Sequence, residues 1–195
     1  MIVTEPNQVL PDQSADPLVE TSRRTMITGV SAAALFAPAV AGWATQAQAQ
    51  AAASAEDEAF MKLALDEARQ GDYPFGTVIT KDGVLWASGH NSGRTEQDPT
   101  AHGEMVAIRN FLTKHSAADL AGTTLYTTGE PCAMCMGAIL WSGISRLVFA
   151  ASVDQMATKI DQIMISSAAL AEVAKFAPIS ITGGVLADEA MALFE

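Results

Sequence analysis

From Glu56 onward, apolar and polar positions follow the periods of helices and strands. Apolar residues three and four apart predict a helix over 56–71 and a second over about 102–114. The expected buried stripes of these two helices are Phe60, Leu63, Ala64 and Ala68 in the first, and Met105, Ile108 and Leu112 in the second. Short runs rich in β-branched and aromatic residues predict strands over 77–80, 84–88, 123–129, 146–152 and 179–182. Further helices are expected over 132–143, near 166–175 and from about 187.

The order of these elements indicates the architecture. Lys81-Asp82-Gly83 has the composition of a tight turn, so the first two strands are expected to form a hairpin. Strands and helices then alternate, which implies parallel crossover connections. We therefore expect an α/β fold, a three-layer α/β/α sandwich around a mixed five-stranded sheet. In this arrangement the helices that start near 102 and 132 lie side by side on the sheet.

The first 49 residues have a different character. Arg23 and Arg24 precede an Ala-rich apolar run over 27–44, and residues 47–49 (Ala-Gln-Ala) form a small-x-small cleavage site. This layout resembles a twin-arginine export signal. It departs from that pattern at 26–28, where Met, Ile and Thr stand in place of the usual Phe, Leu and Lys.

The alternative for this leader is a flexible tail followed by a membrane anchor. Glycine and proline interrupt the run over 27–44, and the run barely reaches the roughly 20 apolar residues that a membrane span needs. We therefore predict a signal peptide with a flexible leader over 1–49 and a mature domain over 50–195. The predicted location is the periplasm, with no stable membrane span after cleavage, and the alternative is the cytoplasm.

Acidic residues dominate the charge of the chain. There are 22 Asp and Glu against 11 Lys and Arg, which gives a formal net charge of −11. Binding to nucleic acid depends on clustered Lys and Arg, because these residues neutralise phosphates and release counterions. The composition therefore disfavours nucleic acid as a partner.

The two cysteines of the chain lie three residues apart, directly after a proline. On a helix, Cys132 and Cys135 project to the same face, and Pro131 suits a first helical turn. Thiolates are favoured at the positive end of a helix, and His102 at the start of the neighbouring helix adds an imidazole. Three protein ligands and one open position are typical of a catalytic zinc site. Taken alone, the two cysteines are equally compatible with a redox pair or a disulfide.

A carboxylate lies next to the candidate imidazole in the sequence. Glu104 is two residues from His102, and in a first helical turn both side chains can point into one pocket. A carboxylate beside a metal site is placed to move protons. Each residue also has a simpler interpretation, since a lone His at a helix start is commonly a cap and a lone Glu there commonly complements the dipole.

Together these residues form the pattern H-x-E followed by P-C-x-x-C, which is the signature of zinc-dependent deaminases. Through "DPTAHGEMVAIR" at 98–109 and "LYTTGEPCAMCMGAILW" at 125–141, the chain resembles the cytidine and deoxycytidylate deaminase superfamily, and within it bacterial guanine deaminases and tRNA adenosine deaminases. The resemblance extends from Glu56 to the C-terminus. It departs from the family pattern at Gly103, where the usual residue is Ala.

The resemblance implies a function and a set of site residues. One Zn²⁺ per chain would be held by His102, Cys132 and Cys135, and Glu104 would carry protons from water to the ring and to the leaving amine. Asn91 in "GHNSGR" matches an asparagine that holds the substrate ring, and the backbone N–H of Gly103 matches one that faces the substrate. Relatives commonly pair, so a homodimer is expected.

The choice of substrate depends on fewer residues. Trp141 matches an aromatic residue that guanine deaminases place in the base pocket, and Asp161 lies where these enzymes present a carboxylate to the base. The simpler interpretations are core packing for Trp141 and solvent exposure for Asp161. The segment 183–194 is more similar to the C-terminal helix of the tRNA enzymes, whereas the acidic surface and the leader oppose a tRNA substrate.

The leading hypothesis is an exported zinc-dependent deaminase that converts guanine to xanthine and ammonia, within purine metabolism. The alternatives are a tRNA adenosine deaminase, a deaminase of another nucleoside or aminated heterocycle, a binding module without turnover, and a periplasmic thiol–disulfide protein.

Overall fold

The computed structural model describes residues 53–194. The predicted leader over 1–49 lies outside the described residues, so its role in export stays a prediction. Five strands form one sheet in the order β2-β1-β3-β4-β5. These strands are β1 (Gly76–Lys81), β2 (Val84–His90), β3 (Thr124–Gly129), β4 (Arg146–Ala151) and β5 (Ser180–Thr182). The helices are α1 (Ala55–Ala68), α2 (Gly103–Leu112), α3 (Ala133–Trp141), α4 (Val153–Met156), α5 (Ser167–Val173) and α6 (Ala187–Met191), with short 3₁₀ turns at Ala117–Leu120 and Ala192–Phe194.

The sheet is mixed, as the sequence predicts. β1 pairs antiparallel with both β2 and β3, whereas β3, β4 and β5 run parallel. Consequently the carboxyl ends of β2, β3 and β4 meet the start of β1 at one edge of the sheet. The segments that follow these strands carry the candidate site residues to that same edge, where open α/β sheets commonly bind ligands.

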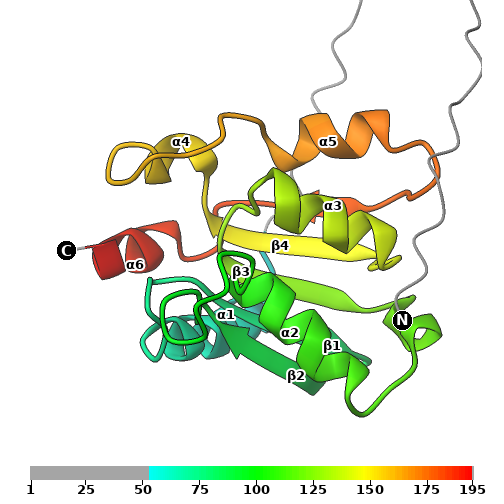
Figure 1. Ribbon diagram of the computed structural model, residues 1–195. Coiled ribbons are helices and arrows are strands. Elements are labelled where there is room, and N and C mark those ends of the chain that lie inside the picture. The colour runs from blue at the N-terminus through cyan, green and yellow to red at the C-terminus, as the bar shows by residue number, and fades with distance from the viewer. Residues whose placement is uncertain (1–52, 195) are drawn as a thin grey trace, which may run out of the picture. The chain divides into compact units, whose positions relative to one another are not determined.

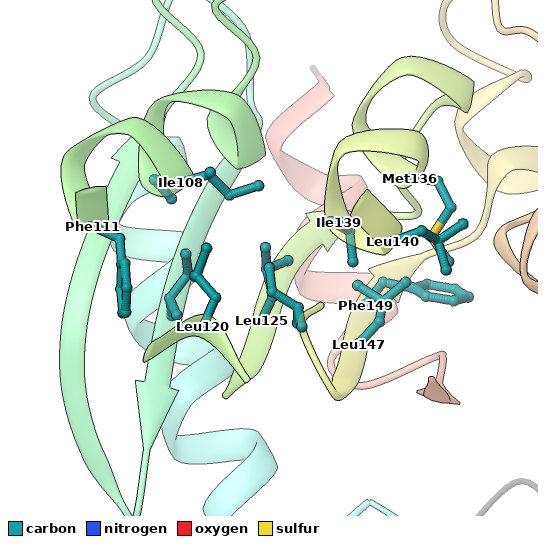
Figure 2. Packing of buried hydrophobic residues seen from close by; sticks show 12 residues of the cluster. Ile108, Phe111, Leu120, Leu125, Met136, Ile139, Leu140, Leu147 and Phe149 are labelled. Carbon is teal, nitrogen blue, oxygen red and sulfur yellow. The ribbon is translucent and has the colours of Figure 1, made fainter. Parts of the chain in front are cut away.

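Helices cover both faces of the sheet, which confirms the three-layer sandwich (Figure 1). Alternate strand residues point to opposite faces, so Ile79 packs under α2 and α3 while Val78 packs against α1. Figure 2 shows the first of these two cores, where side chains of α2 and α3 meet those of β3 and β4. The site therefore lies at the ends of helices that are held firmly by their buried faces.

The buried faces of α1 and α2 differ from the predicted stripes. In α1 the buried apolar residues are Met61, Ala64, Leu65 and Ala68, and in α2 they are Ala107, Ile108 and Phe111. Leu63 and Leu112 are instead 40% and 44% exposed. For α2, a contact with the sheet explains the difference. Phe111 stacks on Trp86 of β2, at 5.8 Å between ring centroids, so the face of α2 that carries Phe111 is turned toward the sheet.

An ion pair between Asp57 and Arg146 connects α1 to the sheet. Asp57 is 2% exposed, and its carboxylate accepts hydrogen bonds from Arg146 of β4 at 2.6 and 3.0 Å. Tyr126 of β3 donates to the same carboxylate at 3.1 Å, and the backbone N–H of Ser54 donates at 3.0 Å. Burial alone would raise the pKa of Asp57, but the hydrogen bonds from Arg146 and Ser54 outweigh it and hold this pKa well below its usual range. The pair therefore stabilises the fold in its charged form.

We expect Asp57→Asn to lower the free energy of unfolding at pH 7 by about 2 kcal/mol, because Arg146, whose side chain is 30% exposed, loses hydrogen bonds to a charged partner. Since folding lowers the pKa of Asp57, its contribution is present above the unfolded value of about 3.9 and is lost as the pH falls below it. The difference in the free energy of unfolding between wild type and variant should therefore become smaller below about pH 4. Urea unfolding of both proteins at pH 7 and at lower pH measures it.

The matched control is Asp66→Asn in the same helix. Asp66 forms an exposed pair with Arg69 at 2.6 Å, with 68% of the Asp66 side chain exposed. Such pairs contribute less than about 1 kcal/mol. Equal losses in the two variants would contradict a stabilising role of the buried pair.

Candidate active site

The candidate metal ligands lie at the N-termini of α2 and α3, at the edge of the sheet where β2, β3 and β4 end. His102 is the N-cap of α2 and Cys132 is the N-cap of α3, and both have extended backbone angles. An N-cap residue lies outside the helical spiral, so its side chain is free to point off the helix end. Cys135 follows one turn into α3 and is fully buried. Pro131 precedes the N-cap and is not in the first helical turn as predicted, because the helix begins only at Ala133.

The ligand atoms of these three residues converge. His102 Nδ1 lies 3.7 Å from Cys132 Sγ and 3.6 Å from Cys135 Sγ, and all three atoms are within 4.8 Å of one another. A tetrahedral zinc with ordinary bond lengths separates a nitrogen ligand from a sulfur ligand by about 3.6 Å. The spacing and the N/S chemistry of this group therefore fit zinc, with one coordination position left for water.

The two thiols of the site differ in acidity. The pKa of Cys132 is lowered to about 4, because Cys135 donates a hydrogen bond to its sulfur and His102 lies next to it. The pKa of Cys135 is raised, because its proton is held in that hydrogen bond and its side chain is buried. The contact with Cys132 also raises the pKa of His102. A thiolate therefore faces the imidazole, and metal binding here displaces protons.

Glu104 lies in the first turn of α2, next to the ligands. Its side chain is 5% exposed and borders the same pocket as His102 and Cys132. Burial raises the pKa of Glu104, and the negative charge of Cys132 raises it further. A raised pKa makes a carboxylate a better proton acceptor, which suits a group that must take up a proton and pass it on.

A pocket of about 580 Å³ opens beside these residues. The predicted residues that line it are Asn91, His102, Glu104, Cys132 and Asp161. Its remaining walls are Tyr73, Phe75, Gly93, Arg94, Pro99, Glu130, Met156, Ile160, Gln162 and Ile163. The volume and the mixture of apolar walls with a few polar groups are typical of a small-molecule site.

Several wall residues were not anticipated from the sequence. Arg94 lies over the ring of Tyr73, at 5.2 Å from its centroid, and Phe75 packs edge-on against Phe194. Glu130 is 7% exposed although no cation pairs with it in the part of the chain that the structure describes. The only local signal for Glu130 is its place two residues before Cys132.

Gly103 starts α2 but is not among the residues that line the pocket. A Cβ at this position would lie 2.9 Å from the carbonyl oxygen of Phe75 and 3.1 Å from Thr77 Oγ1. Glycine therefore allows the start of α2 to approach β1 closely. The backbone N–H of Gly103, at the first position of the helix, stays outside the hydrogen-bond ladder of the helix, as its predicted role requires.

Trp141 does not line this pocket, so its contact with the base stays a prediction. It is the last residue of α3, whereas the pocket lies at the first residues of that helix, about 13 Å away along the axis. Its side chain is 79% exposed and stacks on Phe176 at 4.4 Å between ring centroids. This exposure shows that the alternative interpretation, core packing, is wrong for Trp141.

None of the helices within residues 53–194 combines the length and hydropathy that crossing a membrane requires.

A mixed sheet sandwiched by helices, with a His-Cys-Cys centre beside a buried glutamate, defines the class of zinc-binding hydrolases that activate water. The family described as "Cytidine and deoxycytidylate deaminase zinc-binding region" matches residues 54–151, which include all four of these side chains. This chain belongs to the cytidine and deoxycytidylate deaminase family. Its relatives are deaminases, which are hydrolases that act on carbon–nitrogen bonds.

The relatives act on several substrates, among them guanine, adenosine in tRNA and, for a probable enzyme of Schizosaccharomyces pombe that is 35% identical over 150 residues, cytosine. The guanine deaminase of Bacillus subtilis is 43% identical over 99 residues, covering 48% of this chain and 64% of that protein. The tRNA-specific adenosine deaminase of Aquifex aeolicus is 41% identical over 98 residues, covering 48% of this chain and 65% of that protein. The chain thus spans just under two thirds of the length of each of these last two curated relatives. Among solved structures, guanine deaminase from Nitrosomonas europaea has a TM-score of 0.62 and 30% identity, covering 70% of this chain and 81% of that chain.

Proposed function

We propose that this protein is a zinc-dependent deaminase that replaces the exocyclic amino group of a small purine base by a carbonyl, with guanine as the first candidate. The observation that carries the proposal is the convergence of His102, Cys132 and Cys135 beside the buried Glu104 in one pocket. When bound there, zinc supplies Lewis-acid activation of a water molecule.

The side chains of this pocket would transfer protons and hold the substrate ring. Glu104 accepts a proton from water as the water oxygen bonds to the amino-bearing ring carbon. It then delivers protons to the ring nitrogen next to that carbon and to the departing amino group. The carbon–nitrogen bond breaks, ammonia leaves, and the ring carbon keeps a carbonyl oxygen. Asn91 is fixed by a hydrogen bond from the N–H of Gly93 to its Oδ1 at 3.2 Å. Its side-chain N–H groups therefore remain available for an acceptor on the ring.

The preference for guanine is supported by Asp161. This acidic residue lines the pocket and lies in the segment after α4. Guanine presents two adjacent donors, the ring N1–H and the 2-amino group, which a carboxylate can accept together in charge-assisted hydrogen bonds. Adenine has neither donor, and the net charge of −11 disfavours a tRNA substrate.

Ammonia release from a panel of bases tests the proposal. The panel contains guanine, adenine, cytosine, their nucleosides and other aminated heterocycles, and guanine is expected to give the highest kcat/KM. Faster deamination of adenosine within tRNA, together with a mobility shift of tRNA at physiological salt, would replace guanine by the tRNA alternative. No ammonia release from any substrate by zinc-loaded protein would refute the proposed activity.

Asp161→Ala is expected to raise KM for guanine by at least about tenfold while kcat changes little, because hydrogen bonds to a charged group contribute about 1.5–3 kcal/mol. Bases without the two donors should be affected much less. The control is Asp154→Ala, which removes an exposed acidic residue from α4 that does not line the pocket. Equal KM values for guanine in the two variants would contradict the role of Asp161.

A further inference from the structure

The carboxylate of Glu130 joins the metal-binding loop to both ends of one wall of the pocket. Its Oε2 accepts a hydrogen bond from the backbone N–H of Val153 at 2.9 Å, and its Oε1 accepts one from the backbone N–H of Ser167 at 2.8 Å. Val153 is the first residue of α4 and Ser167 is the first residue of α5. Glu130 itself lies two residues before Cys132, and its own N–H donates to Ala151 at 2.7 Å.

The chain between these two anchors, residues 154–166, forms that wall. Met156, Ile160, Asp161, Gln162 and Ile163 all line the pocket. Within the described part of the chain, the hydrogen bonds of residues 157–165 stay inside 153–165 and reach no other element. Ile163 and Met164 are 62% and 59% exposed, so much of the segment has little packing to hold it. Its placement over the metal centre therefore depends strongly on its two ends.

Both oxygens of Glu130 are needed for this connection. Glutamine at this position keeps one acceptor oxygen and replaces the other by an NH₂ group, which cannot accept a hydrogen bond from an N–H. Aspartate keeps both acceptors but is one methylene shorter. The hydroxyl of Ser167 takes no part, because this fully buried Oγ has no hydrogen-bond partner.

We propose that Glu130 is a positioning residue that holds the segment 154–166 over the metal centre and thereby determines which base the pocket accepts. The part that concerns base selectivity rests on the proposed function. Glu130 acts through the wall that carries Asp161, whereas the zinc ligands and Glu104 lie on α2 and α3. Loosening this wall therefore weakens substrate binding and selectivity more than the chemical step.

The test compares zinc-loaded wild type, Glu130→Gln, Glu130→Asp and the control Ser167→Ala, which removes the unpartnered hydroxyl and keeps the N–H. Hydrogen exchange of backbone amides in 153–167 is measured without substrate. We expect exchange in this region to speed up at least about tenfold in Glu130→Gln, with an intermediate effect in Glu130→Asp and none in Ser167→Ala. Zinc content should equal that of wild type in all four proteins.

Kinetics on guanine and on competing bases give the second measurement. In Glu130→Gln we expect KM for guanine to rise at least about tenfold, kcat to fall less than about threefold, and the preference for guanine over other bases to shrink. Unchanged exchange in 153–167 would overturn the proposal, as would a loss of zinc with kcat falling in proportion. If wild type deaminates none of the bases, the proposed function fails, while the exchange data still decide whether Glu130 holds the segment.

Discussion

Glu104→Gln is expected to lower kcat/KM for ammonia release by at least about 100-fold while zinc remains bound at the wild-type level, because removal of a general acid–base typically costs 10²–10⁴-fold. Glutamine has nearly the same shape and can occupy the same buried place in the first turn of α2, but it cannot shuttle a proton. Since Glu104 is not one of the three converging ligands, the metal should stay. Steady-state ammonia release and metal analysis of the same sample measure both quantities.

The matched control is Glu58→Gln, which makes the same chemical change at an exposed position of α1. Its kcat/KM should equal that of wild type. Undiminished ammonia release by Glu104→Gln would remove Glu104 from its assigned role. Loss of zinc in Glu104→Gln would instead indicate that the carboxylate of Glu104 helps to hold the metal. A binding module without turnover predicts no ammonia release from wild type in the same assay.

The metal centre could be predicted from the sequence because it depends on short spacings at helix starts. Two cysteines three apart meet on one helix face in any α-helix, and Pro131 marks the start of that helix closely enough. His102 follows a polar loop that ends in a proline and a threonine, so its place before a helix was also visible. The alternation of strands and helices likewise predicted the mixed sheet, and the structure confirms it.

The pocket wall could not be predicted, because its residues are brought together by contacts between distant segments. Arg94 reaches the pocket because the carboxylate of Asp72 accepts hydrogen bonds from its N–H at 2.8 Å and from that of Thr95 at 2.7 Å. The role of Glu130 depends on N–H groups 23 and 37 residues further along the chain. No periodic pattern in the sequence predicts either contact.

The hydrophobic pattern of the sequence also does not predict which helix face is buried or where a single aromatic residue lies. Hydrophobic spacing shows that α1 is amphipathic, but it does not show that Asp57, a charged residue paired with Arg146, lies on the inner face. Trp141 is an aromatic residue for which core packing is a natural expectation, yet it lies exposed at the last residue of α3. Apolar character alone therefore does not determine whether a side chain faces the core, the pocket or solvent.

Cys135→Ser is expected to abolish zinc binding and to lower ammonia release by at least about 1,000-fold, because a bound metal contributes several kcal/mol to stabilising the transition state. The hydroxyl of serine is too weak a zinc ligand to replace the buried sulfur of Cys135. Exhaustive chelation of wild type should give the same loss, together with a lower melting temperature, since a metal that binds only the folded state stabilises it. Metal analysis, ammonia release and thermal unfolding measure the three effects.

Adding zinc back distinguishes loss of the metal from damage to the fold. Added zinc should restore activity and melting temperature to chelated wild type but not to Cys135→Ser, because only the former keeps all three ligands. Purified wild type with near-stoichiometric zinc and reduced cysteines is expected. A metal-free wild type whose Cys132 and Cys135 cycle between dithiol and disulfide at an oxidising potential would favour the thiol–disulfide alternative, because a disulfide between these two sulfurs removes both from the metal centre.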